Sequence, residues 1–276
     1  MDVHWQEKTL DCDGMIRRAR VYAPAGAVVG SGAQKAPPAI VLHLHGGTFT
    51  SGDLDCSVAI CRSLAAAGAT VVSLDYPLAP EHPFPAALNV SFAALNLLHR
   101  QRATWAGRGA RLFVAGEEAG ANIATALTLM ARDQHHPPIA GQILISPMLD
   151  PSLGTQSVRA ARVGEAGCRW ADGWHLYLGS ADKAAHPYAA PLGSRRLGGI
   201  PPALIITSQC CPMCDESLAY GRRLVECGVS VQSHVVREDA PSLSPGPALP
   251  GWAQDLTSHF SAFLAGANTP AAALGA

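Results

Sequence analysis

The chain has 276 residues, of which 48% are hydrophobic and 15% are charged, and its formal net charge is −1. This size and composition suit one globular domain with a large core, and the near-neutral charge argues against a nucleic-acid-binding surface. No apolar run is long enough to cross a bilayer and the N-terminus is polar and acidic, so we expect a cytoplasmic protein with no membrane partner.

Apolar runs rich in β-branched residues predict strands that are buried on both faces. They lie at 39–45, 69–75, 111–116, 141–146 and 202–208. Helices are predicted between and after them, at 56–68, 86–101, 119–133 and 215–228. This alternation predicts an α/β fold with a doubly wound, mostly parallel sheet, in which ligands bind beyond the carboxyl ends of the strands.

The domain boundaries follow from the same patterns. Residues 1–14 are expected to form a short N-terminal segment, because the first strand-like stretch is MIRRARVYAP at 15–24. The main domain is expected to span 15–266. Residues 267–276 are rich in alanine and are expected to form a loose tail.

One turn stands out within the main domain. The stretch LFVAGEEAGANIATAL (112–127) predicts a strand, a sharp turn and a helix. Gly116 and Gly120 permit that turn, where a larger side chain would clash, and Glu118 lies at its centre.

Four further motifs closely resemble the hormone-sensitive-lipase-like branch of the α/β-hydrolases. They are HLHGGTFTSGD (43–53), VVSLDYPLAPEHPFPAAL (71–88), SPMLD (146–150) and GIPPALIITS (199–208). The likeness runs from about residue 16 to residue 264. It implies an α/β-hydrolase fold and descent from carboxylesterases, which use a serine activated by histidine and aspartate, with backbone N–H groups that hold the oxyanion.

The resemblance places other residues at all three catalytic positions. Glu118 replaces the serine, Cys211 replaces the aspartate and Pro241 replaces the histidine. Glutamate has no hydroxyl proton to give, proline cannot take a proton, and a thiol is a poor charge partner. The triad is therefore interpreted as degenerate, and ordinary serine-esterase activity is predicted to be absent.

The oxyanion hole is predicted to survive. By the resemblance, Gly46, Gly47 and Ala119 supply its N–H groups, while Thr48 replaces the third glycine of the family's motif. The same glycines also serve the fold, so their presence alone does not assign a function.

Three functions remain open for Glu118. The first is a pseudo-esterase that binds a small carbonyl or carboxyl metabolite, or a partner protein. In a purely structural role, the Glu118 carboxylate would instead fill the former oxyanion hole. The second is an isomerase, lyase or cyclase that uses Glu118 as general acid or base. The third is a hydrolase with a relocated base, which would need a histidine within hydrogen-bonding distance of Glu118.

Two effects compete over the charge of Glu118. The helix that follows it favours the carboxylate by about 0.3–1 kcal/mol. A dry pocket and the neighbouring Glu117 favour the neutral acid, since full burial shifts a carboxyl pKa by about 3–5 units. The sequence does not decide which effect is larger.

Neither a cofactor nor a metal is expected. Cys210, Cys211 and Cys214 form a C-x-x-C with an adjacent thiol before a helix, which leaves a redox or three-thiolate metal site as a minor alternative.

The family's N-terminal cap is predicted to be reduced, so a homodimer partner or another protein is an alternative cover for the pocket. Trp170, Trp174 and Tyr177 share one face of a predicted helix at 168–179, where they either pack against the domain or line a ligand pocket.

Overall fold

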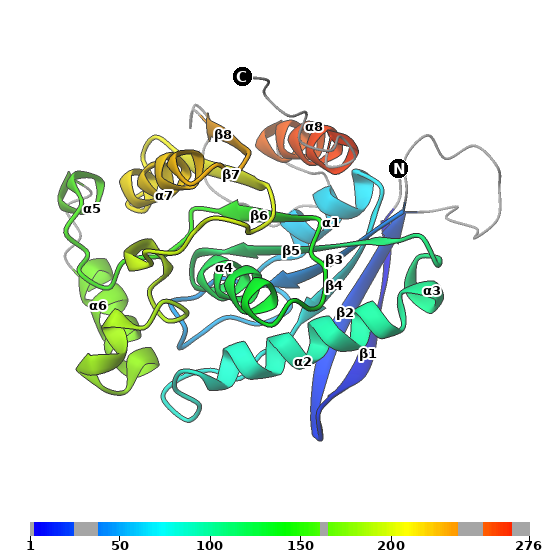
Figure 1. The fold of residues 1–276 in the computed structure, drawn as a ribbon, viewed down its shortest axis with the longest axis horizontal. Helices are drawn as coiled ribbons and strands as arrows, with labels where there is room; N and C mark the ends of the chain where they lie inside the picture. The colour runs from blue at the N-terminus through cyan, green and yellow to red at the C-terminus, as the bar shows by residue number, and fades with distance from the viewer. Residues whose placement is uncertain (1–2, 25–37, 161–164, 237–250, 267–276) are drawn as a thin grey trace.

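A computed structural model describes residues 3–24, 38–160, 165–236 and 251–266 of the chain (Figure 1). Its eight strands form one sheet in the order β1-β2-β4-β3-β5-β6-β7-β8. The strands are β1 (Val3–Cys12), β2 (Met15–Pro24), β3 (Ala39–Leu44), β4 (Ala69–Leu74), β5 (Arg111–Glu117), β6 (Gly141–Ile145), β7 (Ala203–Ser208) and β8 (Val231–Val236). The β1–β2 and β2–β4 pairs are antiparallel, and the other pairs are parallel.

Helices cover both faces of this sheet. One core cluster packs α1 (Val58–Ala66) and α8 (Gly251–Gly266) against one face. A second cluster packs α2 (Ala86–Arg100), α4 (Glu118–Asp133) and α7 (Cys214–Glu226) against the other. The predicted doubly wound α/β fold is therefore confirmed, and the helical layers are visible on either side of the sheet in Figure 1.

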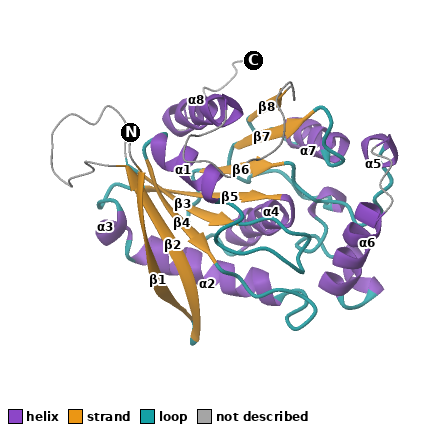
Figure 2. Cartoon of the chain, turned by 180° about the vertical axis from the view of Figure 1, so that it is seen from behind, coloured by secondary structure: helices purple, strands orange, loops and turns teal. Residues whose placement is uncertain are grey.

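The remaining helices are short or lie outside these two layers. They are α3 (Arg102–Trp105), α5 (Gln156–Ala160), α6 (Glu165–Leu178) and the 3₁₀ helices η1 (Ala181–Ala185) and η2 (Pro191–Gly193). Figure 2 shows α5 and α6 at one side of the molecule and the β1–β2 hairpin at the other. None of the helices among the described residues combines the length and apolar character that a membrane span requires.

The N-terminal segment differs from the expectation. Residues 1–14 were expected to lie outside the main domain, but Val3–Cys12 forms β1 and pairs with β2 along its whole length. Backbone hydrogen bonds to β2 hold this edge strand, and most of its side chains are exposed, so its sequence carries little hydrophobic periodicity. The described residues before β2 thus form a strand of the sheet and not a helical cap.

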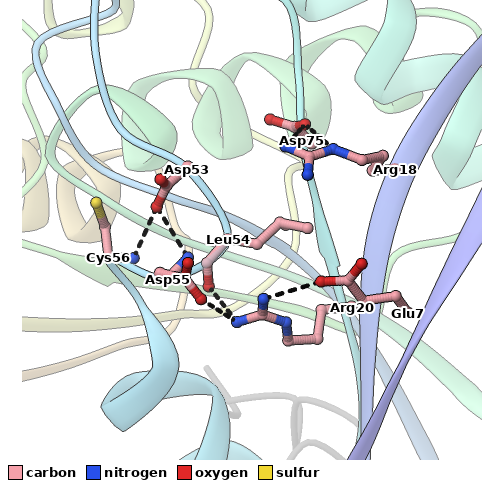
Figure 3. Close-up of polar contacts among 8 residues, drawn as sticks. All are labelled: Glu7, Arg18, Arg20, Asp53, Leu54, Asp55, Cys56 and Asp75. Atoms are coloured by element: carbon pink, nitrogen blue, oxygen red, sulfur yellow. Dashed lines mark hydrogen bonds and ion pairs between the residues drawn. The ribbon is translucent and has the colours of Figure 1, made fainter.

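A buried arginine joins this hairpin to the loop before α1 (Figure 3). Arg20 of β2 is 6% exposed. One of its Nη atoms lies 3.2 Å from the Leu54 carbonyl oxygen and 2.7 Å from Asp55, and the other lies 3.0 Å from Glu7 of β1. These contacts fix the loop that follows the predicted oxyanion motif.

The turn between β5 and α4 depends on close backbone packing. A Cβ atom on Gly120 would overlap the carbonyl oxygens of Leu44 and His45, and one on Gly116 would overlap the backbone of Gly120. The first turn of α4 therefore lies directly against the end of β3.

We predict that Gly120→Ala lowers the free energy of unfolding by more than about 2 kcal/mol, because the added methyl group has no room beside Leu44. Gly109→Ala is the matched control, since a Cβ there meets no atom within 4 Å, and it should change stability by less than about 1 kcal/mol. Urea denaturation checks both variants. Equal stabilities for the two would contradict the packing described here.

Candidate functional site

The centre of the site is the turn at Glu118. This residue is the first of α4 and has φ +46°, a left-handed conformation that is uncommon for a residue with a side chain. Its carbonyl oxygen accepts a hydrogen bond from the Met148 N–H at 3.1 Å. The turn places the Glu118 side chain at the carboxyl end of β5, where ligands bind in sheets of this kind.

The predicted oxyanion loop lies against this side chain. The Gly47 N–H donates a hydrogen bond to Oε2 of Glu118 at 3.2 Å. A Cβ on Gly46 would lie 3.3 Å from the same oxygen. Ala119 is fully buried, and its N–H lies in the first turn of α4, where helices leave N–H groups without an intrahelical acceptor. The structure thus brings Glu118 together with Gly46, Gly47 and Ala119.

The rest of the loop packs against α6. Thr48 and Phe49 have φ +57° and +68°, and Thr48 is the position where the family resemblance expects a glycine. Phe49 stacks on Tyr177 with ring centroids 3.9 Å apart, and it contacts Trp174 at 4.9 Å. A Cβ on Gly173 of α6 would overlap the carbonyl oxygen of Thr48.

The aromatic residues of α6 therefore pack against the loop. Trp174 and Tyr177 are each 2% exposed, and Trp170 is partly buried. Of the two roles left open by the sequence, these contacts favour packing. The helix holds the loop that carries the Gly47 N–H.

Burial decides the competition over the charge of Glu118. Burial raises the pKa of this carboxyl above its ordinary value, and Glu117 raises it further. The Gly47 N–H and Arg169 of α6 lower the pKa, but each by less than burial raises it. The sequence did not single out Arg169, because its position relative to Glu118 depends on how α6 folds back over the domain. Glu118 therefore keeps its proton to a higher pH than an exposed glutamate.

The other two altered triad positions are less closely involved. Pro241 lies outside the described residues. Cys211 is partly buried in the loop before α7, and its backbone bonds to Ser208 and Cys214. His234, the nearest histidine upstream of Pro241, stacks on His259 of α8 with ring centroids 3.7 Å apart. Within the described part of the chain, no histidine hydrogen-bonds to the side chain of Glu118.

One thiol of the C-x-x-C, that of Cys214, lacks the lowered pKa of a reactive cysteine. Burial raises the pKa of Cys214, and Asp215 and Cys211 raise it further, whereas reactive cysteines have lowered pKa values. Among the described residues, no group of three histidine, cysteine or acidic side chains is arranged to hold a metal ion.

Sequence analysis missed a buried carboxyl close to the site. Glu216 of α7 is 2% exposed, and its Oε2 accepts the N–H groups of Leu149 at 2.8 Å and Asp150 at 2.9 Å. Burial raises the pKa of Glu216 to about 8, although the two N–H donors oppose this. Glu216 thus fixes the loop that follows β6. The sequence feature that could have pointed to Glu216 was its position two residues after the C-x-x-C.

Comparisons with known proteins show the family of the chain. A family model described as the alpha/beta hydrolase fold matches residues 41–240. Carboxylesterase NlhH of Mycobacterium tuberculosis is 35% identical over 240 residues, which cover 82% of this chain and 71% of that protein. The gibberellin receptor GID1 of Oryza sativa subsp. japonica is 32% identical over 208 residues, which cover 71% of this chain and 58% of the receptor.

Solved structures give the same result. The crystal structure of esterase LipW from Mycobacterium marinum superposes with a TM-score of 0.79 and 32% identity, covering 98% of this chain and 82% of that chain. The named relatives are esterases and, in one case, a receptor.

We predict that Glu216→Gln removes a pH dependence of stability. The folded-state pKa of about 8 lies above the ordinary 4.5, so across this window the folded protein holds a proton that the unfolded chain has released. The stability of the wild type should therefore fall as pH rises from about 4.5 to about 8, by at most ~1.4 kcal/mol per pH unit.

Denaturation midpoints measured at pH 5, 6, 7 and 8 check this prediction. The exposed Glu226→Gln, on the same helix, is the control and should keep the wild-type slope. If Glu216→Gln also keeps that slope, the carboxyl is not the buried acid described here.

Proposed function

Because the chain belongs to the α/β-hydrolase fold family, in its hormone-sensitive-lipase-like branch, we propose that it is a catalytically degenerate member. On this proposal it binds a small carbonyl- or carboxyl-bearing molecule and does not hydrolyse esters by the family's serine mechanism. A partner protein or a second copy of the chain is the other class of ligand that the proposal allows.

The contact between Glu118 and Gly47 carries this proposal. In a serine hydrolase the elbow side chain is short, and the N–H groups of the loop remain available for the oxygen of the substrate. Here the Glu118 carboxyl itself accepts the Gly47 N–H at 3.2 Å. A side chain that uses the oxyanion donor in this way competes with an ester carbonyl for the same position.

The chemistry around Glu118 suits a ligand that offers acceptor oxygens. The pKa of Glu118 is raised, and its protonated form has an O–H to donate. Arg169 adds positive charge from α6. A relative named as a receptor, the rice protein, supports the view that this scaffold can serve binding.

One observation favours a second candidate, a non-hydrolytic enzyme. A carboxyl with a raised pKa beside backbone N–H donors can move a proton next to a carbonyl oxygen. Glu118 would then act as general acid or base in an isomerase, lyase or cyclase. Hydrolysis with a relocated base is less favoured, since no described histidine hydrogen-bonds to Glu118.

We predict no turnover of short p-nitrophenyl esters above the rate of the Glu118→Ala variant. Glu118→Ser alone should gain little, because a catalytic triad acts as a unit. The triple variant Glu118→Ser, Cys211→Asp, Pro241→His should gain measurable turnover if the oxyanion donors are intact. Wild-type turnover that Glu118→Ala abolishes would overturn the proposal.

We predict that short carboxylic acids and ketones raise the melting temperature of the wild type. The effect of a carboxylic acid should weaken as pH rises through the pKa of Glu118, because two carboxylates repel each other. Glu118→Gln should bind with no such pH dependence. Thermal-shift assays between pH 5 and 8 measure both effects, and no shift with any compound at any pH would count against binding of this ligand class.

The same samples separate the two candidates. NMR spectra of each binding compound, recorded over hours with protein, report whether it is converted. Conversion that Glu118→Gln abolishes while binding persists would establish the second candidate in place of the first.

A further inference from the structure

A second pair of ionisable groups, one buried and one partly buried, lies beside the elbow and is not used by the function proposed above. His43 of β3 is 0% exposed, and its Nε2 lies 3.2 Å from Oε1 of Glu117, the last residue of β5. We propose that His43 carries a positive charge that neutralises Glu117 and thereby controls the charge state of Glu118. His43 is in this view a positioning residue, since it acts on Glu118 through Glu117.

The two glutamates are adjacent in the chain but face different neighbours. Glu118 turns to the Gly47 N–H, and Glu117 turns to His43. Gly46 lies between them, because a Cβ on it would be 3.3 Å from Oε2 of Glu118 and 3.6 Å from Cβ of Glu117. Carboxyl groups that lie near each other disfavour each other's ionised form, and Glu117 raises the pKa of Glu118.

Three polar groups face the buried ring of His43, those of Glu117, Ser73 and Cys61. Cys61 of α1, which is fully buried, faces it from the helix, and Ser73 of β4 places its Oγ 3.2 Å from Nδ1. Burial alone would lower the pKa of His43, but Cys61 and Glu117 outweigh it and raise the pKa to about 10. The neighbouring His45 has a pKa lowered by burial and by the charge of His43.

The consequence for Glu118 follows from electrostatics. With His43 charged, the repulsion that the Glu117 carboxylate exerts on an ionised Glu118 is reduced, although not removed. Without that cation, Glu117 would push Glu118 further toward its neutral form. The other groups facing Glu118 are Arg169, which opposes this, and Tyr76, whose own pKa is raised well above its ordinary value by burial.

This inference deepens the proposed role of Glu118 and rests on that role for its functional meaning. Its test does not require a ligand. The carboxyl ¹³C signals of glutamate-labelled protein are followed by NMR against pH, and Glu118→Gln identifies the Glu118 signal.

Three variants form the decisive cycle. His43→Gln, which keeps a polar side chain but loses the charge, should raise the Glu118 titration midpoint by about one pH unit. Glu117→Gln should lower the midpoint. The double variant should match Glu117→Gln alone, because the buried ring of His43 loses its proton when its carboxylate partner is removed. An unchanged midpoint in His43→Gln, or the same rise when residue 117 is already glutamine, would overturn the inference.

Ser73→Ala is the matched control. It removes the side-chain oxygen that lies beside Nδ1 of His43 but leaves the charge, so the Glu118 midpoint should remain at the wild-type value. If the midpoint rises as much as in His43→Gln, packing around His43 explains the effect and the charge does not.

A second measurement keeps the inference testable if His43→Gln does not fold. In ¹⁵N-histidine-labelled wild-type protein at pH 7, both ring nitrogens of His43 should carry a proton. A neutral ring would overturn the proposal. Because both titrations use ligand-free protein, failure of the ligand-binding tests would leave these results unaffected.

Discussion

The backbone turn at Glu118 is the constraint on which the rest of the site depends. Two residues without side chains, Gly116 and Gly120, let the start of α4 approach the end of β3 so closely that no Cβ fits between them. This packing holds Glu118 at φ +46° and directs its side chain toward Gly47. The packing of Gly116 and Gly120, and not the Glu118 side chain, sets this geometry.

The loop that carries Gly47 is held just as firmly from the other side. Phe49 of the loop stacks on Tyr177 of α6, and Gly173 lets α6 touch the backbone of Thr48. Thr48 keeps the left-handed backbone at φ +57° even though it is β-branched, a conformation that is costly for such a residue. Its retention indicates that the surrounding packing, and not the local sequence, sets the shape of the oxyanion loop.

The sequence predicted the parts of this structure that depend on local pattern. The buried parallel strands are continuous apolar runs, and the elbow and oxyanion glycines have a fixed spacing, so β3, β5 and Gly47 were all found. Strand β1 was missed because an exposed edge strand is held by backbone hydrogen bonds, which leave no hydrophobic pattern. The contacts of His43 and Glu216 were missed because their partners lie far away in the sequence and meet only in the folded sheet.

The charges around Glu118 also explain why the proposed function expects a ligand that accepts hydrogen bonds. A serine is neutral at the elbow, whereas a glutamate brings an ionisable group into a partly buried place that already contains Glu117. Burial and Glu117 drive Glu118 toward the neutral acid, while the Gly47 N–H and Arg169 favour the carboxylate. In the neutral state the Glu118 O–H joins the N–H groups of Gly47 and Ala119, and a site made of donors is complementary to a carbonyl or carboxylate oxygen. In the ionised state Glu118 accepts the Gly47 N–H itself and repels an anion. On the proposed function, the protonation state of Glu118 determines whether the Gly47 N–H is available to a ligand or occupied by the Glu118 side chain.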